Sequence, residues 1–187
     1  MRSFEVEVEV EVEDNDLSLI LVKYEELYLR ELTYYGTSDH NQMLMLINIG
    51  QEISRVENII IEKYYSKYVS EVNKSLKNLE IYYLQQILFC SLDIILTMVM
   101  LWTVNKHKLN SEEFEFKTRY LIGLLENFVE KFIDPISLNL NLIISSNKIF
   151  KINYPIGFLK KYINLNKYKF TSKEKIIQLE RCIRLLS

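Results

Sequence analysis

The stretch ILFCSLDIILTMVMLWTV, residues 87–104, decides the fold class of this chain. Its only formally charged residue is Asp93, so the stretch must be covered by lipid, by the core of its own fold or by another subunit. Gln86, Cys90, Asp93 and Thr97 recur at spacings of four, three and four, which places them on one narrow stripe of a helix. That pattern favours a helix surrounded by other helices over a single membrane span, which is kept as the less favoured alternative.

The same stretch carries more apolar surface than one helix of a four-helix monomer needs to bury. An exposed patch of that size would be an association surface. Leu, Met and Trp dominate it, and these residue types are typical of obligate interfaces between water-soluble proteins. The sequence therefore predicts a helix that a partner protein covers.

The composition predicts a folded and mostly helical chain. Hydrophobic residues make up 49% and charged residues 26% of the 187 residues, which is too apolar for wholesale disorder. Only four glycines and two prolines are present, so turns are few and long helices are favoured. The two cysteines match no metal-ligand spacing, and no apolar leader precedes the first helix, which predicts a reducing intracellular compartment.

Apolar residues at helical spacing predict four helices before Pro135. They are expected from Leu17 to just before Gly36, from Ser38 or Asp39 for about seven turns, from near Lys74 to around Asn105–Lys108, and from the capping-box-like Asn110–Glu113 to Pro135. The stripe expected to be buried on the second helix comprises Met43, Leu46, Ile47, Ile53, Val56, Ile60 and Tyr64.

A change of pattern after Pro135 predicts a second kind of structure. LNLNLIISSNKIFKIN, residues 138–153, contains two β-prone runs around a turn at residues 145–147. KYKFTS, KEKIIQLER and CIRLLS (167–187) are expected to be a strand, a short helix capped by Thr171 or Ser172, and a final strand. The predicted fold class is therefore mainly α, with a four-to-five-helix bundle over residues 17–134 followed by a small β-rich domain over residues 138–187.

The first 16 residues form a separate acidic arm in which Phe4 and four valines alternate with five glutamates. A period of two places the glutamates on one face of a strand, where like charges repel, so the strand would form only when docked. The arm is expected to be frayed or loosely docked, and the alternative is an edge strand that recruits a partner.

Residues that support catalysis or cofactor binding are not arranged in any recognisable motif. The four glycines stand alone, with no phosphate-binding loop around them, and His40 and His107 lack a second ligand within helical reach. Without a constellation of catalytic groups, the prediction is a protein that is not an enzyme and needs no cofactor or metal.

The C-terminal residues are basic, and Lys160, Lys161, Lys167 and Lys169 alternate with aromatic residues. Charge together with stacking surfaces would permit single-stranded nucleic-acid binding. The favoured interpretation is a small β domain with one core face and one solvent face, and any DNA contact is expected to be weak.

Four segments resemble one known family. They are EELYLRE (25–31), NLEIYYLQQILFCSLDIIL (78–96), LNSEEFEFKTRYLIGLLENFVEKFIDPI (109–136) and the terminal YKFTSKEKIIQLERCIRLLS (168–187). Together with the order of a helical domain before a small β domain, they resemble the SLD-five subunits of the GINS complex of the eukaryotic replicative helicase. The chain departs from that family where Ser91, Leu92 and Thr97 replace basic residues of the long helix, and its β region is shorter.

The resemblance implies a non-catalytic scaffold that acts in the nucleus during initiation and elongation of DNA replication. It implies pairing with three sister GINS subunits and contact with the helicase ring and its accessory protein, without a cofactor or a membrane. On this basis the main interface is expected at Ile87, Leu88, Leu92, Asp93, Ile95, Met98, Met100, Trp102, Phe128 and Phe132. Asp93 is expected to set the register of that interface by meeting an arginine or a hydroxyl group.

Overall fold

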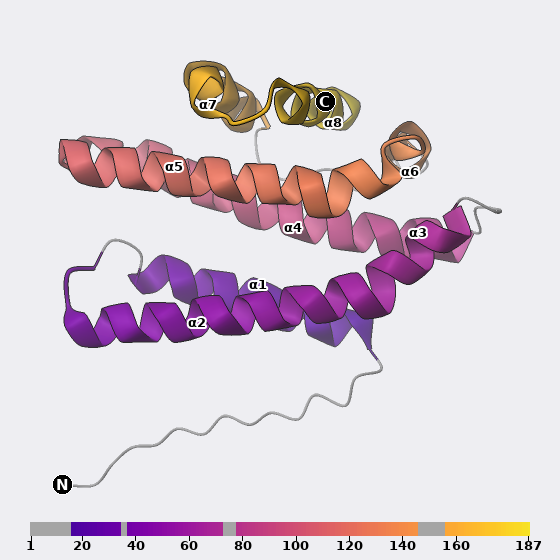
Figure 1. Cartoon of the computed structure of the whole chain (residues 1–187), viewed down its shortest axis with the longest axis horizontal. Helices are drawn as coiled ribbons and strands as arrows, with labels where there is room; N and C mark the ends of the chain where they lie inside the picture. Colours follow the sequence, from indigo (N-terminus) through magenta and orange to yellow (C-terminus); the bar gives the residue numbers. More distant parts are fainter. Residues whose placement is uncertain (1–15, 35–36, 73–77, 146–155) are drawn as a thin grey trace, which may run out of the picture.

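The lowest layer of the fold in Figure 1 is an antiparallel pair of helices. The structure, a computed structural model, describes residues 16–34, 37–72, 78–145 and 156–187. The pair consists of α1, Leu17–Tyr34, and α2, His40–Ile59. Both starts are set by acidic caps, since Asp16 Oδ1 accepts the Ser18 N–H at 3.0 Å and Asp39 Oδ1 accepts the Gln42 N–H at 3.0 Å. The predicted starts of the first two helices are therefore confirmed.

The second predicted helix is longer than expected because it continues past α2 without a break. A π-helical segment, η1 (Ile60–Tyr65), leads into α3, Ser66–Val72. α3 packs against α4 and so connects the lowest layer to the next one (Figure 1).

The middle layer is a second antiparallel pair, α4 (Asn78–Asn105) and α5 (Ser111–Phe128), joined by the 3₁₀ turn η2, Lys106–Lys108. A reciprocal capping box starts α5: Asn110 Oδ1 accepts the Glu113 N–H at 2.9 Å, and Glu113 Oε2 accepts the Asn110 N–H at 3.2 Å. This start is also confirmed. α4 contains the long apolar stretch and lies between the first pair and the C-terminal helices.

α5 ends in a second π-helical segment, η3 (Val129–Ile133), and a 3₁₀ turn, η4 (Asp134–Ile136). The Tyr65 hydroxyl of η1 donates a hydrogen bond to the main-chain oxygen of Phe132 in η3, and the two rings meet edge to face with centroids 5.4 Å apart. The two π-helical segments therefore contact each other across the bundle. Pro135 lies in η4, where the helix was predicted to end.

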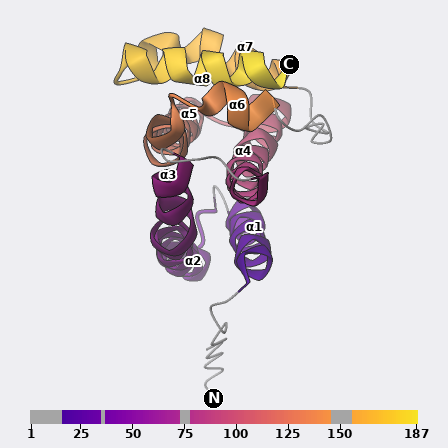
Figure 2. The same ribbon diagram turned by 90° about the vertical axis from the view of Figure 1, so that its right-hand side faces the viewer.

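The third layer consists of helices that cross over the middle pair (Figure 2). α6, Leu140–Ser145, precedes α7, Gly157–Asn166, the 3₁₀ turn η5, Lys167–Lys169, and α8, Lys173–Leu186. Leu159 and Tyr162 of α7 and Leu179 of α8 belong to the same hydrophobic cluster as the buried residues of α1, α2, α4 and α5. One continuous core therefore runs through all three layers.

The prediction of a mainly helical fold is confirmed, but the expected strands are not present in the described part of residues 138–187. Residues 140–145 form α6, residues 167–169 form η5, and residues 182–186 complete α8. Leu140, Ile143 and Ile144 are buried at helical spacing, so an alternation of leucine and asparagine that imitates a strand also supplies one helical face. The run at 148–153, most of the expected turn and nearly all of the acidic arm lie outside the described residues.

Candidate functional site

Most of the predicted interface residues lie in the core of the chain itself. Ile87, Leu88, Leu92, Ile95, Met98, Trp102, Phe128 and Phe132 are each at most 9% exposed, and Met100 and Asp93 are half-buried. α1, α3, α5, α6 and α7 all pack against α4 and cover it. The large apolar side chains of the stretch that stay exposed are Leu101, at 44%, and Val104, at 63%. The expected excess of apolar surface is therefore confined to the C-terminal end of α4.

Asp93 is half-buried and forms no ion pair with any described lysine or arginine. Burial, and then the negative charge of Glu25, raise the pKa of its carboxyl group. The Thr97 hydroxyl donates a hydrogen bond at 2.9 Å to the main-chain oxygen of Asp93, not to its side chain. Among the residues that the structure describes, the Asp93 carboxylate has neither the expected arginine nor the expected hydroxyl group as a partner.

A polar cluster in the middle of the bundle joins four helices. The Tyr24 hydroxyl donates to Glu57 Oε2 at 3.4 Å, and Lys131 Nζ forms an ion pair with the other oxygen of Glu57. These residues, with Tyr28 and the buried Ser91, surround or adjoin a cavity of about 30 Å³ between α1, α2, α4 and α5. Burial raises the pKa of both tyrosines, so their hydroxyls stay protonated and act as hydrogen-bond donors. The cluster therefore links the packed helices through a hydrogen bond and an ion pair.

A second polar contact holds α1 against α5. The Tyr120 hydroxyl donates a hydrogen bond to Glu31 Oε1 at 2.8 Å. Glu31 is buried, and burial raises the pKa of its carboxyl group although the bond from Tyr120 opposes the shift. Sequence reasoning missed this residue because Glu31 lies among charged residues of an amphipathic helix.

Metal-ligating and nucleophilic residues do not converge in the described ranges. Within those ranges no three His, Cys, Asp or Glu side chains are grouped to hold a metal ion. His40 and His107 are exposed and lie on different elements, at the start of α2 and in η2. Burial raises the pKa of the Cys90 and Cys182 thiols to about 12 in both cases, which suppresses the reactive thiolate at neutral pH.

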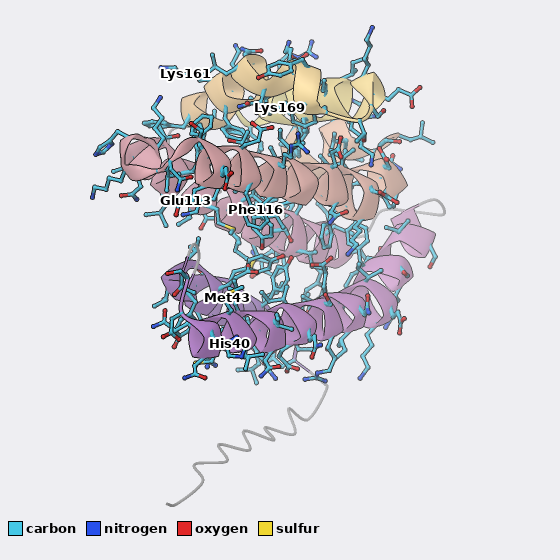
Figure 3. All side chains as sticks on the ribbon, turned by 60° about the vertical axis from the view of Figure 1, so that its left-hand side comes forward. His40, Met43, Glu113, Phe116, Lys161 and Lys169 are labelled. Carbon is cyan, nitrogen blue, oxygen red and sulfur yellow. The ribbon has the colours of Figure 1, made fainter. Side chains whose placement is uncertain are left out.

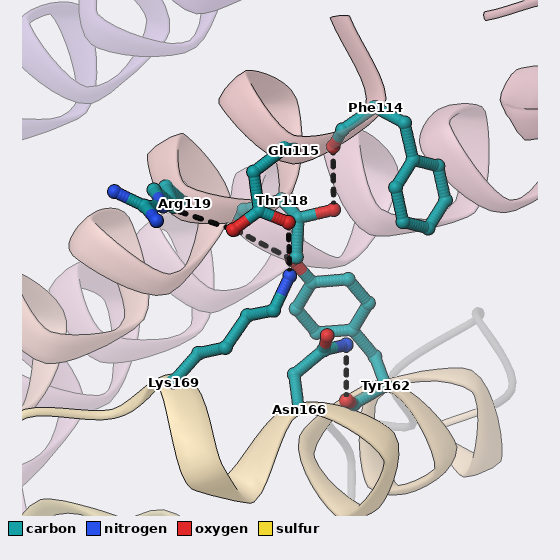
Figure 4. A network of polar contacts seen from close by, with 7 residues as sticks. All are labelled: Phe114, Glu115, Thr118, Arg119, Tyr162, Asn166 and Lys169. Atoms are coloured by element: carbon teal, nitrogen blue, oxygen red, sulfur yellow. Dashed lines mark hydrogen bonds and ion pairs between the residues drawn. The ribbon is translucent and has the colours of Figure 1, made fainter. Parts of the chain in front are cut away.

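The four lysines proposed for nucleic-acid binding fall into two pairs. Lys169 forms an ion pair with Glu115 of α5, which also binds Arg119 at 2.9 Å (Figure 4), and Lys167 pairs with Glu180 at 2.5 Å. Lys160 and Lys161 are exposed on α7 and have no carboxylate partner among the residues described. Two of the lysines therefore contribute to packing of the C-terminal helices, and two remain available to a ligand.

Further hydrogen bonds hold the third layer against α5 of the middle layer. The Tyr162 hydroxyl donates to the main-chain oxygen of Thr118 at 2.9 Å (Figure 4). Farther along α5, Glu126 Oε1 accepts hydrogen bonds from the Thr171 N–H at 2.6 Å and the Thr171 hydroxyl at 2.8 Å. Acidic residues of α5 thus meet basic and hydroxyl groups of the C-terminal helices, which gives part of the basic C-terminal region a structural role.

A candidate binding surface lies instead at the start of α2. Met43, Leu44, Met45 and Ile47 are 47%, 47%, 40% and 56% exposed; these four residues are called the α2 apolar surface below. Met43 and Ile47 were expected on the buried stripe, and that expectation is wrong, whereas Ile53, Val56 and Ile60 of the same stripe are buried. The signal in the sequence is the run MLMLI itself, because it covers every side of the helix and cannot be buried against a single neighbour.

Other exposed apolar residues lie at the same end of the bundle. The α2 apolar surface follows the connection from α1 to α2, and Val104 and the 68% exposed Phe116 flank the connection from α4 to α5. Figure 1 places both connections at the left end of the molecule, and Figure 3 shows Met43 and Phe116 on one face, from the lowest and the middle layer. Exposed apolar groups from two layers therefore gather at one end.

One helical span within the described ranges, Glu80–Lys108, is long and apolar enough to cross a membrane by length and composition. Its most apolar window is 61% buried inside the fold, as is common for the central helix of a water-soluble bundle.

Comparisons with models of protein families, with curated proteins and with solved structures find no match to this chain.

Proposed function

We propose that this chain is a non-catalytic scaffold that binds a partner protein through the α2 apolar surface. The observation that supports the proposal is the exposure of Met43, Leu44, Met45 and Ile47 on a regular helix with a formed cap. Large apolar side chains that cluster on a surface are stabilised by a covering partner. Methionine adapts its shape to a partner more readily than branched residues do.

The start of α2 is held in place before any partner binds. The Asp39 N–H donates to Thr37 Oγ1 at 3.2 Å, and Asp39 Oδ1 accepts the Gln42 N–H at 3.0 Å. A preformed helix loses less conformational entropy on binding than a segment that folds at that moment. This supports a surface that presents its side chains as a rigid helix to a groove on the partner.

The finer form of the proposal is a subunit of a GINS-type complex in the nucleus, which joins sister subunits and the replicative helicase. It rests on the resemblance of residues 25–31, 78–96, 109–136 and 168–187 to the SLD-five subunits. In this form the α2 apolar surface, with Val104 and Phe116 at the same end of the bundle, supplies contacts that the ten predicted interface residues of α4, α5 and η3 were expected to supply.

Co-expression with the three sister subunits tests the proposal. The unchanged chain is expected to elute with them as one complex in size-exclusion chromatography. Ile47→Glu places a charge on the α2 apolar surface and is expected to weaken the complex at least tenfold. The matched control is Ile177→Glu on α8, since Ile177 is 60% exposed and Ile47 is 56% exposed. Equal effects of the two variants, or a chain that never joins the complex, would contradict the proposal.

A further inference from the structure

A groove lies between α7 and α8. Its volume is about 440 Å³, within the range of sites that enclose ligand side chains. Its lining includes Ile163 and Ile183, which are buried, and Lys160 and Arg184, which are exposed. Apolar groups therefore form its base, while long cationic side chains stand at its rim.

The rim cations are available to a ligand. Neither Lys160 nor Arg184 forms an ion pair with another residue of the described ranges. Glu180 also lines the groove, but it is paired with Lys167 at 2.5 Å. An occupant with carboxylates next to small apolar side chains would satisfy both the base and the rim.

The chain itself contains such a segment. Residues 4–13 alternate Phe4 and four valines with five glutamates. In an extended backbone, apolar residues would lie on one face and carboxylates on the other. The valines could then contact Ile163 and Ile183, while Lys160 and Arg184 could reach the glutamates and relieve the repulsion between them.

Chain length favours binding between two molecules over binding within one. α1 starts in the lowest layer and the groove lies in the third (Figures 1 and 2), so two helix-to-helix spacings of about 8–10 Å each separate them. Residues 14–16 can extend over about 10 Å at most. They are too short to bring the whole of residues 4–13 of the same chain into the groove.

We propose that residues 4–13 of one molecule bind the α7–α8 groove of a second copy of this chain. The contact joins two different surfaces, so it either closes into a reciprocal dimer or continues as a head-to-tail chain. This inference goes beyond the proposed scaffold role and uses a surface separate from the α2 apolar surface.

Sedimentation velocity on the full chain at 50 and 500 mM salt, concentrations chosen to vary screening, provides the test. The chain is expected to self-associate at low salt, with at least tenfold weaker association at high salt. Two charge-reversed variants should each abolish self-association. The first changes the groove and combines Lys160→Glu with Arg184→Glu. The second changes the segment and combines Glu7→Lys, Glu9→Lys and Glu11→Lys. A mixture of these two charge-reversed chains should associate again.

The matched control is Lys161→Glu with Lys173→Glu, which changes net charge equally at exposed positions outside the groove lining. This variant should self-associate like the unchanged chain. A chain that is monomeric at both salt concentrations would overturn the inference. Self-association that survives both charge reversals but is lost in Ile47→Glu would also overturn it, because the α2 apolar surface would then be the contact. Loss of sister-subunit binding alone bears only on the proposed function.

Discussion

The apolar stretch of α4 and the α2 apolar surface have similar composition but opposite environments. α4 packs against α1, α3, α5, α6 and α7, whereas α1 is the main neighbour of α2. Val99 is fully buried, but Ile47 is 56% exposed. Burial thus follows the number of neighbouring helices more than the hydrophobicity of a segment. The shorter apolar run, not the longer one, is the better candidate for contact with a partner.

Truncation of leucine should give the largest difference between the two regions. Leu96→Ala removes a side chain with no exposed surface and is expected to lower the free energy of unfolding by about 2–5 kcal/mol. Leu44→Ala, at a position 47% exposed, should change it by about 0.5 kcal/mol or less. Urea unfolding followed by circular dichroism measures both. Similar losses would mean that the two apolar runs are equally buried.

The reaction rates of cysteine thiols should also differ between α4 and the α2 apolar surface, with a smaller difference in free energy than the leucine truncations give. Burial, followed by the charge of Glu25, raises the pKa of Cys90 in α4 to about 12, so little thiolate exists at pH 8, whereas an exposed thiol has a pKa near 8.5. A cysteine introduced by Met45→Cys should react at least about a hundredfold faster with a disulfide reagent. The native thiols in the same molecule serve as the internal reference. Comparable rates would show that α4 opens as readily as the start of α2.

A substitution at Glu31 tests the polar contact between α1 and α5 that Glu31 forms with Tyr120. Its raised pKa means that ionisation is more costly in the folded state, so stability falls as pH rises from the unfolded-state pKa through the folded-state pKa. Glu31→Gln should therefore raise the free energy of unfolding at pH 7, with the gain disappearing at pH values below the unfolded-state pKa. Exposed Glu26→Gln is the control. A Glu31→Gln variant less stable than the unchanged chain at pH 7 would contradict this prediction.

Glu52 should give the smallest effect, at the point where α2 passes from exposed to buried residues. Hydrogen bonds from Arg55, and then the nearby Lys23 at 3.0 Å, lower the pKa of its carboxyl group to about 2. The stabilisation is present above the unfolded-state pKa and is lost as pH falls towards 2. Because the pair is partly exposed, Glu52→Gln should cost only about 0.5 kcal/mol at pH 7 and nothing below pH 2. NMR titration of the carboxyl group measures the pKa directly.

Local signals in the sequence predicted the helix boundaries well. Asp16, Asp39 and the Asn110–Glu113 capping box start the helices where they were expected, and Pro135 lies in η4, the turn that follows α5 and η3. Each of these signals acts through backbone groups within a few residues. Such boundaries can be predicted without knowledge of the tertiary structure.

Signals that depend on tertiary neighbours were less informative. Leucine and asparagine alternate at residues 138–141, but burial of Leu140, Ile143 and Ile144 selects a helix there. The apolar periodicity of α2 likewise could not show that Ile53 is buried while Met43 is 47% exposed. Short apolar runs are ambiguous until the surfaces that cover them are known.

The contact between η1 and η3 makes the packing of the bundle sensitive to the number of residues in each of these two segments. Each π-helical segment is wound more loosely than an α-helix, and the Tyr65 and Phe132 rings meet where the two segments face each other. Deleting one residue from Ile60–Tyr65 would turn the following side chains by about 100° around the helix axis, which would move the Tyr65 hydroxyl away from its carbonyl acceptor. A substitution in η1 or η3 changes a side chain at this contact but keeps the same sequence positions facing each other. An insertion or deletion brings different sequence positions into contact.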